Sequence, residues 1–141
     1  MWLLLAAALV TGSASAGPLP SALVDAYLQV QVALAADRFE GVAAPARAVE
    51  AAAAALGQEG EKLAGRAKAL AAAKDIAAAR TTFGEMSHEL EAYAEKTKST
   101  FPSDVRLAYC PMADKSWRQK GQEIRNPYYG AGMLTCGSFK N

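Results

Sequence analysis

Four sulfur-bearing side chains gather near the C-terminus of this 141-residue chain. Cys110 and Met112 flank Pro111, and Met133 precedes Cys136 by three positions. Thiolate and thioether groups are soft ligands, and in combination they favour Cu(I). Zinc is the poorer candidate, because it prefers cysteine and histidine over methionine. These residue types therefore predict a soft-metal site built from the four sulfurs.

The local spacing determines which of these sulfurs could meet. Proline restrains the residue before it to extended conformations, and residues i and i+2 of an extended chain point to the same side. We therefore expect the sulfurs of Cys110 and Met112 to face the same way. Met133 and Cys136 would meet on one helical turn or a tight bend. On a strand they would point to opposite faces, and only one of them could join the site.

The same cysteines support a second interpretation that needs no metal. A disulfide between Cys110 and Cys136 would close a loop around the 25 residues between them, which is worth roughly 3 kcal/mol of stability. Methionine is also a common filler of hydrophobic cores. The spacing leaves three alternatives open: a disulfide, a metal site, and cysteines that only pack.

The single histidine, His88, lies on a predicted helix close to Met86 and Leu90. A lone histidine on a helix is by default a surface residue. We expect it to act as a metal ligand only if the C-terminal part of the chain folds back beside it. Met86 shares a helical stripe with apolar residues, so we expect it in the core.

Patterns typical of catalysis are missing from the sequence. It contains no Gly-rich phosphate loop and no Cys-x-x-Cys redox pair. His88-Glu89 does not begin a His-Glu-x-x-His zinc motif, because residue 92 is alanine. A net charge of +1 provides no strong field for nucleic acid. We therefore expect a binding or structural protein, not an enzyme, and no nucleic-acid partner.

Residues 1–16 predict the compartment of the protein. The apolar run MWLLLAAALV is followed by TGSASA, in which Ala14 and Ala16 fit an A-x-A cleavage pattern, although no Lys or Arg precedes the run. The run is too short to span a bilayer, which takes roughly 20 residues. We expect a signal peptide that is removed before Gly17, a periplasmic or secreted protein, and no stable membrane insertion. In such an oxidising compartment two cysteines often pair.

Residues 17–100 predict an all-α fold, a small antiparallel bundle of about four helices. Alanine, the best helix former, occupies about half of positions 43–79. Ile76, Phe83 and Leu90 recur every seven residues, a spacing suited to bundle packing. Short connections favour antiparallel neighbours. The expected helices span residues 21–36, about 44–57, about 60–73 and about 76–98.

Short polar residues mark the expected helix starts. We expect Ser21 to cap the first helix and Asp75 the fourth. Asp37 with Glu40 three residues later has the spacing of a capping box for the second helix. Pro45 is acceptable there only within the first turn.

Residues 101–141, here called the C-terminal segment, carry six of the eleven aromatic residues of the chain. The composition predicts an irregular wrap or a short β-hairpin packed on the bundle as part of one domain. We expect strands over residues 105–109 and 132–139, with Trp117 as the anchor. The stretch NPYYG at 126–130 predicts a turn.

Several stretches taken together resemble an exported bacterial family known largely as a domain of unknown function. The residues that carry this resemblance are CPMA (110–113), Trp117, EIRNPYYG (123–130) and Met133-Leu134-x-Cys136-Gly137. The upstream stretches AYLQVQVALAADRFEGV and AARTTFGEMSHEL match more loosely. Members of that family occur alone or attached to periplasmic adaptor subunits of heavy-metal efflux systems.

The resemblance implies a helical bundle with a sulfur-bearing wrap and a role around copper or related metals. Carried onto this chain, the candidate metal ligands are Cys110, Met112, Met133 and Cys136. We therefore expect an exported Cu(I)-binding protein, with an efflux adaptor or another periplasmic protein as its partner. The alternative is a structural or protein-interaction module that a Cys110–Cys136 disulfide holds together.

Overall fold

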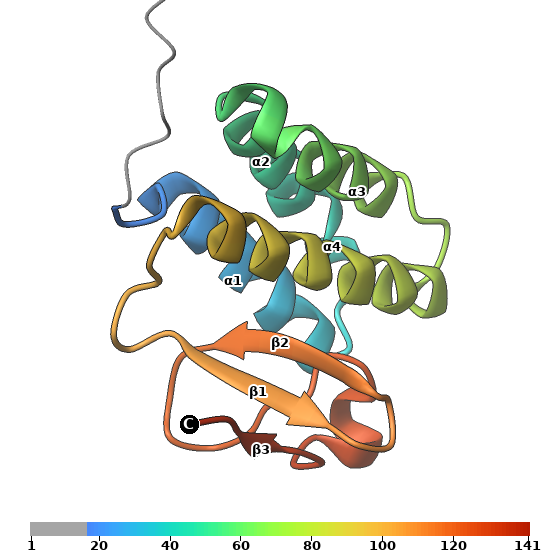
Figure 1. The fold of residues 1–141 in the computed structure, drawn as a ribbon. Helices are drawn as coiled ribbons and strands as arrows, with labels where there is room; N and C mark the ends of the chain where they lie inside the picture. The colour runs from blue at the N-terminus through green and yellow to red at the C-terminus, as the bar shows by residue number, and fades with distance from the viewer. Residues whose placement is uncertain (1–16) are drawn as a thin grey trace, which may run out of the picture.

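The computed structural model describes residues 17–141, a four-helix bundle with a small sheet at its C-terminal end (Figure 1). The predicted signal peptide, residues 1–16, lies outside the described residues. Short 3-10 turns, η1 (Phe39–Gly41) and η2 (Gly57–Gly60), join the first three helices. The helices are α1 (Ser21–Ala35), α2 (Ala43–Ala54), α3 (Glu61–Ala71) and α4 (Ile76–Thr97).

The predicted start of α4 is confirmed, and the starts of α1 and α2 differ from the prediction. Asp75 caps α4 by accepting a 2.7 Å hydrogen bond from the Ala78 N–H. Ser21 is the first residue of α1 and makes no capping bond, because the carbonyl of Pro20 already accepts the first helical hydrogen bonds. Asp37 does not cap α2. It adopts a φ of 55°, and its carboxylate binds Arg80 and the Ala131 N–H instead.

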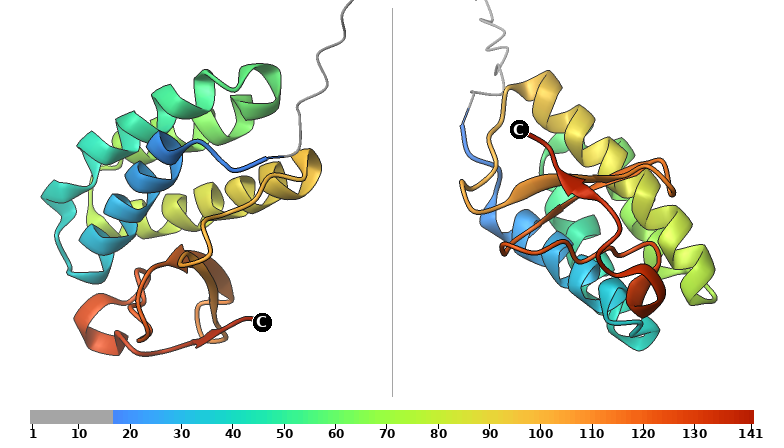
Figure 2. Two further views of the ribbon diagram at one scale, coloured as in Figure 1. Left: turned by 90° about the vertical axis from the view of Figure 1, so that its left-hand side faces the viewer. Right: turned by 90° about the horizontal axis from the view of Figure 1, so that it is seen from below.

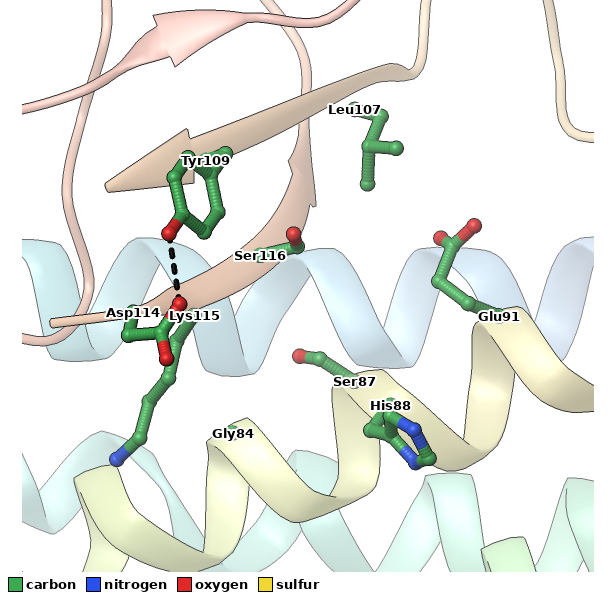
Figure 3. Close-up of a pocket in the computed structure, with 9 residues that line it drawn as sticks. All are labelled: Gly84, Ser87, His88, Glu91, Leu107, Tyr109, Asp114, Lys115 and Ser116. Atoms are coloured by element: carbon green, nitrogen blue, oxygen red, sulfur yellow. Dashed lines mark hydrogen bonds between the residues drawn. The ribbon is translucent and has the colours of Figure 1, made fainter. Parts of the chain in front are cut away.

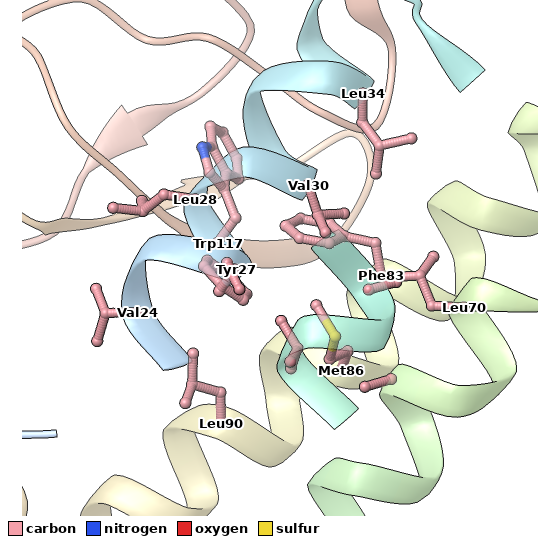
Figure 4. Close-up of a cluster of buried hydrophobic side chains, with 14 of the residues drawn as sticks. Val24, Tyr27, Leu28, Val30, Leu34, Leu70, Phe83, Met86, Leu90 and Trp117 are labelled. Atoms are coloured by element: carbon pink, nitrogen blue, oxygen red, sulfur yellow. The ribbon is translucent and has the colours of Figure 1, made fainter. Parts of the chain in front are cut away.

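Apolar stripes from the helices form one continuous core (Figure 4). On α1, the predicted stripe of Leu23, Tyr27, Val30 and Leu34 is buried. On α4 the expected core position of Met86 is confirmed, since its side chain is fully buried. Small side chains let the helices approach closely. The fully buried alanines of the helices are Ala46, Ala53, Ala67 and Ala79.

Three antiparallel strands in the order β2-β1-β3 form the sheet of the C-terminal segment. They are β1 (Arg106–Cys110), β2 (Lys115–Gln119) and β3 (Ser138–Phe139). The prediction of β1 is confirmed, whereas most of the strand expected over residues 132–139 is wrong. A turn at residues 111–114 reverses the chain directly after β1, with Asp114 at a φ of 50°. The hairpin partner is therefore β2, and residues 130–133 form the 3-10 turn η3 (Gly130–Met133).

The sheet lies beside the bundle, with β2 next to α1 and α4 (Figure 2). A row of aromatic rings crosses this boundary. Phe83 stacks on Tyr27 with ring centres 5.2 Å apart, and Tyr128 lies 5.8 Å from Phe83. Trp117, which is buried, meets Tyr128 edge to face. The rings bind the C-terminal segment to the bundle through apolar contact. Among residues 17–141 no helix has the length and apolar character needed to cross a membrane.

Candidate paired-cysteine site

The two cysteines meet where the end of β1 faces the bend before β3. Cys110 is the last residue of β1 and is fully buried, and Cys136 is half-buried. Their Sγ atoms lie 2.9 Å apart, and both thiols are free. The structure therefore brings together the two residues that both sequence interpretations needed.

Asn126 fixes the position of Cys136 from within the protein. Its side chain is fully buried, and its Nδ2 donates to the Cys136 carbonyl over 2.8 Å. Its backbone N–H donates to the Leu134 carbonyl over 2.7 Å, and its Oδ1 accepts the Tyr128 N–H. A buried amide with this many partners holds the bend before β3 rigidly.

The surroundings of the two sulfurs give the two thiols different acidities. Burial raises the pKa of Cys110, but hydrogen bonds from Cys136, from the N–H groups of Ala113 and Met112 and from Asn126 together lower it below the usual value. The hydrogen bond to Cys110 raises the pKa of Cys136. Loss of one proton from the pair therefore produces a thiolate on Cys110, and the Cys136 thiol donates a hydrogen bond to this thiolate.

The two methionines differ in their relation to the cysteines. Met112 is 65% exposed although Cys110 is buried, so the expectation that their sulfurs face the same way is wrong. The physical reason is that β1 ends at Cys110 and Pro111 enters a turn, so the i, i+2 rule of extended chains does not apply. The Cys136 N–H donates to the Met133 carbonyl over 3.1 Å, so of the alternatives considered for these residues the structure has the tight bend and not the strand.

His88 lies apart from the cysteines. It is exposed on α4 and lines a pocket together with Leu107 and Tyr109 of β1 (Figure 3). Successive strand residues point to opposite faces, so this pocket and Cys110 lie on opposite faces of β1. Within residues 17–141, no three His, Cys, Asp or Glu side chains are grouped to hold a metal ion.

Sequence reasoning missed the buried polar residues that shape the C-terminal segment. Gln119 is fully buried, and its Oε1 accepts the Trp117 indole N–H and the Arg125 N–H. Its Nε2 donates to the Glu123 carbonyl over 2.7 Å. Asn126 likewise holds the bend before β3 through its buried amide group. A signal for Asn126 was present in the sequence, because this residue lies within the distinctive stretch EIRNPYYG, whereas Gln119 precedes that stretch by four residues.

Comparisons with known proteins agree with the helical part of the chain. The sequence profile of a family described as "protein of unknown function (DUF3347)" matches residues 23–100, more than half of the chain. The match covers α1 to α4 and stops before the C-terminal segment. No curated protein and no solved structure matches the chain.

Proposed function

This chain belongs to the DUF3347 family of proteins of unknown function, and we propose that it is an exported binding module with a paired-thiol centre at Cys110 and Cys136. The 2.9 Å separation of the two sulfurs carries the proposal. In the oxidised state the pair is a disulfide that holds the C-terminal segment together. In the reduced state it binds a soft cation, Cu(I). The role is binding and not catalysis.

The oxidised state is favoured by how little the sulfurs must move. A disulfide has sulfurs about 2 Å apart, so an approach of about 1 Å is enough. The loop between the cysteines also carries contacts to the bundle. Arg80 donates to the Pro127 carbonyl, and Gln31 donates to the Arg125 carbonyl. A covalent link at the ends of this loop would stabilise the module as a rigid structural or protein-interaction unit.

Copper binding in the reduced state is favoured by the lowered pKa of Cys110, because the thiolate is the form that binds metals. Two sulfurs that each lie about 2.3 Å from one ion are separated by about 3.8 Å at a tetrahedral angle. Binding therefore requires the pair to open by about 1 Å. Cys136 is the sulfur to move, since it is half-exposed and Cys110 is buried.

Further donors of the proposed centre are Met133 and Met112. Thioethers complete a soft ligand set for Cu(I). Met133 begins the bend that ends at Cys136, and Met112 follows Cys110 by two residues and is free to swing, being 65% exposed. His88 is not part of this donor set, because its pocket lies on the other face of β1.

The location of the protein and the identity of its partner are proposed from sequence patterns and not from the geometry of the site. The signal-peptide pattern of residues 1–16 supports a periplasmic or secreted location. The resemblance of the C-terminal stretches to an exported domain family supports a role in heavy-metal handling, with an efflux adaptor or another periplasmic protein receiving the ion. Under this proposal the protein sequesters Cu(I) or passes it on.

Two measurements test the two states of the centre. Non-reducing mass spectrometry of protein taken from the bacterial periplasm should find the Cys110–Cys136 bond, and a mild reductant should open it. Reduced protein titrated with Cu(I) against a competing chelator should bind about one equivalent. The matched control is Cys110→Ser with Cys136→Ser, checked for folding by circular dichroism.

Each outcome has a definite meaning. If the double serine variant binds Cu(I) as well as the parent protein, the copper role is wrong. If the disulfide forms but resists mild reductant, only the structural role survives. If neither the bond nor copper binding is found, the paired-thiol centre is excluded.

A further inference from the structure

We propose that an external dithiol reduces the cysteine pair by attacking Cys136 alone, and that Cys110 is the sulfur that leaves. This assignment rests on the paired-thiol centre proposed above and adds the chemical class of the reactant that controls it. A dithiol that attacks at Cys136 converts the structural disulfide into the reduced pair that binds Cu(I). The two sulfurs differ in accessibility and in hydrogen bonding, and both differences favour this order.

Cys110 is covered by the chain that leads into β3. It is 0% exposed and belongs to the hydrophobic core. The register of β1 and β3 pairs Tyr109 with Ser138, so Gly137 lies opposite Cys110. A Cβ at Gly137 would come within 2.7 Å of the Tyr109 carbonyl oxygen and 3.0 Å of the Trp117 ring. This close approach leaves no space for an external thiol to reach Cys110.

Cys136 offers the accessible sulfur of the pair. It is half-buried and lies at the margin of the core, and its neighbour Thr135 is exposed. The line from Cys110 Sγ to Cys136 Sγ therefore runs from the core towards the surface. A nucleophile attacks a disulfide along the line of the S–S bond. At Cys136 this approach comes from the solvent side, whereas at Cys110 it would have to come through the core.

Hydrogen bonding favours Cys110 as the leaving sulfur. Its Sγ accepts the Ala113 N–H over 3.4 Å from the turn that follows β1. A hydrogen bond of this kind stabilises the negative charge that remains on a sulfur when a disulfide breaks. In disulfide exchange the better stabilised thiolate leaves faster. Accessibility and hydrogen bonding therefore select the same direction of attack.

The exchange needs no reactant other than the dithiol. One of its thiolates attacks Cys136 Sγ, a new S–S bond forms, and the electron pair of the old S–S bond remains on Cys110. The second thiolate of the dithiol then attacks the reductant's own sulfur in the mixed disulfide, so that Cys136 leaves with its electron pair. The two protons lost by the dithiol are taken up by the two cysteines. Two electrons thus pass to the protein, and the dithiol becomes a disulfide.

The closeness of the two sulfurs explains why the reductant must carry two thiols. In the mixed disulfide the Cys110 thiolate stays beside Cys136, since the sulfurs of the reduced pair lie 2.9 Å apart. An intramolecular attack from this position has a very high effective concentration, so it re-forms the original bond and expels a single thiol. A second thiol on the same reductant competes with this return, because its own attack is intramolecular as well.

The two single variants test the accessibility of each sulfur. The chromogenic disulfide DTNB should react quickly with folded Cys110→Ser, which retains Cys136. With folded Cys136→Ser, which retains Cys110, the reaction should be more than about tenfold slower, because the reagent meets Cys110 only in locally opened molecules. In urea both variants should react at the same rate, which is the control for an effect of the fold. Equal rates in the folded variants, or a faster reaction at Cys110, would overturn the proposal.

The oxidised parent protein provides a second test that needs no variant to fold. After brief treatment with the monothiol cysteamine, an acid quench and alkylation of free thiols, mass spectrometry of tryptic peptides locates the adduct. It should be found on peptide 126–140, which contains Cys136, and not on peptide 107–115, which contains Cys110. Dithiothreitol should reduce the pair at a concentration at which cysteamine leaves it oxidised.

The outcomes separate this proposal from the one on which it rests. An adduct at Cys110, or equal reduction by the two reagents, contradicts the order of attack or the need for a dithiol, and leaves the paired-thiol centre intact. If the oxidised parent contains no bond between Cys110 and Cys136, the structural role of the centre itself is wrong. The reactivities of the two single variants towards DTNB require neither the disulfide nor copper, so they test the order of attack on their own.

Discussion

The Arg80 guanidinium donates to the Asp37 carboxylate over 2.6 Å, and this pair joins α4 to the connection after α1. Arg80 also donates to the carbonyls of Pro127 and Leu34, and Asp37 accepts the Ala131 N–H. One arginine and one aspartate therefore connect two helices and the C-terminal segment. Most of the Arg80 side chain is buried, and its bonds to the Pro127 and Leu34 carbonyls are partly shielded from water, whereas the Asp37 carboxylate is 43% exposed.

Replacing Arg80 should loosen the C-terminal segment. We expect Arg80→Met to lower the free energy of unfolding by about 2 kcal/mol, because bonds to a charged donor are each worth about 1.5–3 kcal/mol and some partners regain water. Urea unfolding followed by tryptophan fluorescence measures the loss. The control is Arg66→Met, whose ion pair with Glu85 is exposed on both sides and should contribute less than about 1 kcal/mol. Equal losses in the two variants would contradict this account.

The same network predicts how stability depends on pH. The Ala131 N–H and then the Arg80 guanidinium hold the pKa of Asp37 below its usual value. A depressed pKa in the folded state gives stability that is complete above the pKa of the unfolded chain, about 3.9. This stability is lost as the pH falls through the lower folded value. Asp37→Asn should therefore be less stable than the parent at neutral pH, and the gap should close in acid below about pH 4. A gap independent of pH would show that the Asp37 charge is irrelevant.

Gly130 should not tolerate a side chain. Its φ is 59°, and a Cβ there would collide with the Asp37 carboxylate and with Arg80. We expect Gly130→Ala to cost about 1–3 kcal/mol from the unfavourable backbone conformation and the displaced ion pair. Gly132→Ala is the matched control two residues away, since open space surrounds that position. Thermal unfolding of both variants compares them directly, and a loss of equal size at Gly132 would contradict the argument.

The helices could be predicted from the sequence because their signals are local. The capping of α4 by Asp75 and the burial of Met86 follow from spacing along a single helix. The role of Asp37 could not be predicted in this way. Its carboxylate binds Ala131, 94 residues further along the chain, and no local pattern records that contact. Its capping-box spacing with Glu40 was a local pattern that a tertiary contact overrode.

The candidate site likewise has one feature that could be predicted from the sequence and others that could not. The meeting of Cys110 and Cys136 followed from the presence of two cysteines in an aromatic-rich segment. The outward direction of Met112 did not, because it depends on whether the strand continues past Pro111 or turns there. The pocket between α4 and the hairpin could not be predicted from the sequence either. It requires residues from α4 and from β1 to face each other, which only the docking of the C-terminal segment produces.

Oxidation of the cysteine pair should stabilise the protein. Closing the loop between Cys110 and Cys136 restricts the unfolded chain, and a loop of this length is worth about 3 kcal/mol. The urea midpoint of oxidised protein should therefore exceed that of reduced protein, which is measured by running both unfolding curves with and without a reductant. In Cys136→Ser the reductant should have no effect, because no intramolecular bond can form. If oxidised and reduced parent proteins unfold at the same urea concentration, the disulfide does not hold the C-terminal segment together. The structural role of the thiol pair would then be wrong, even if copper binding is confirmed.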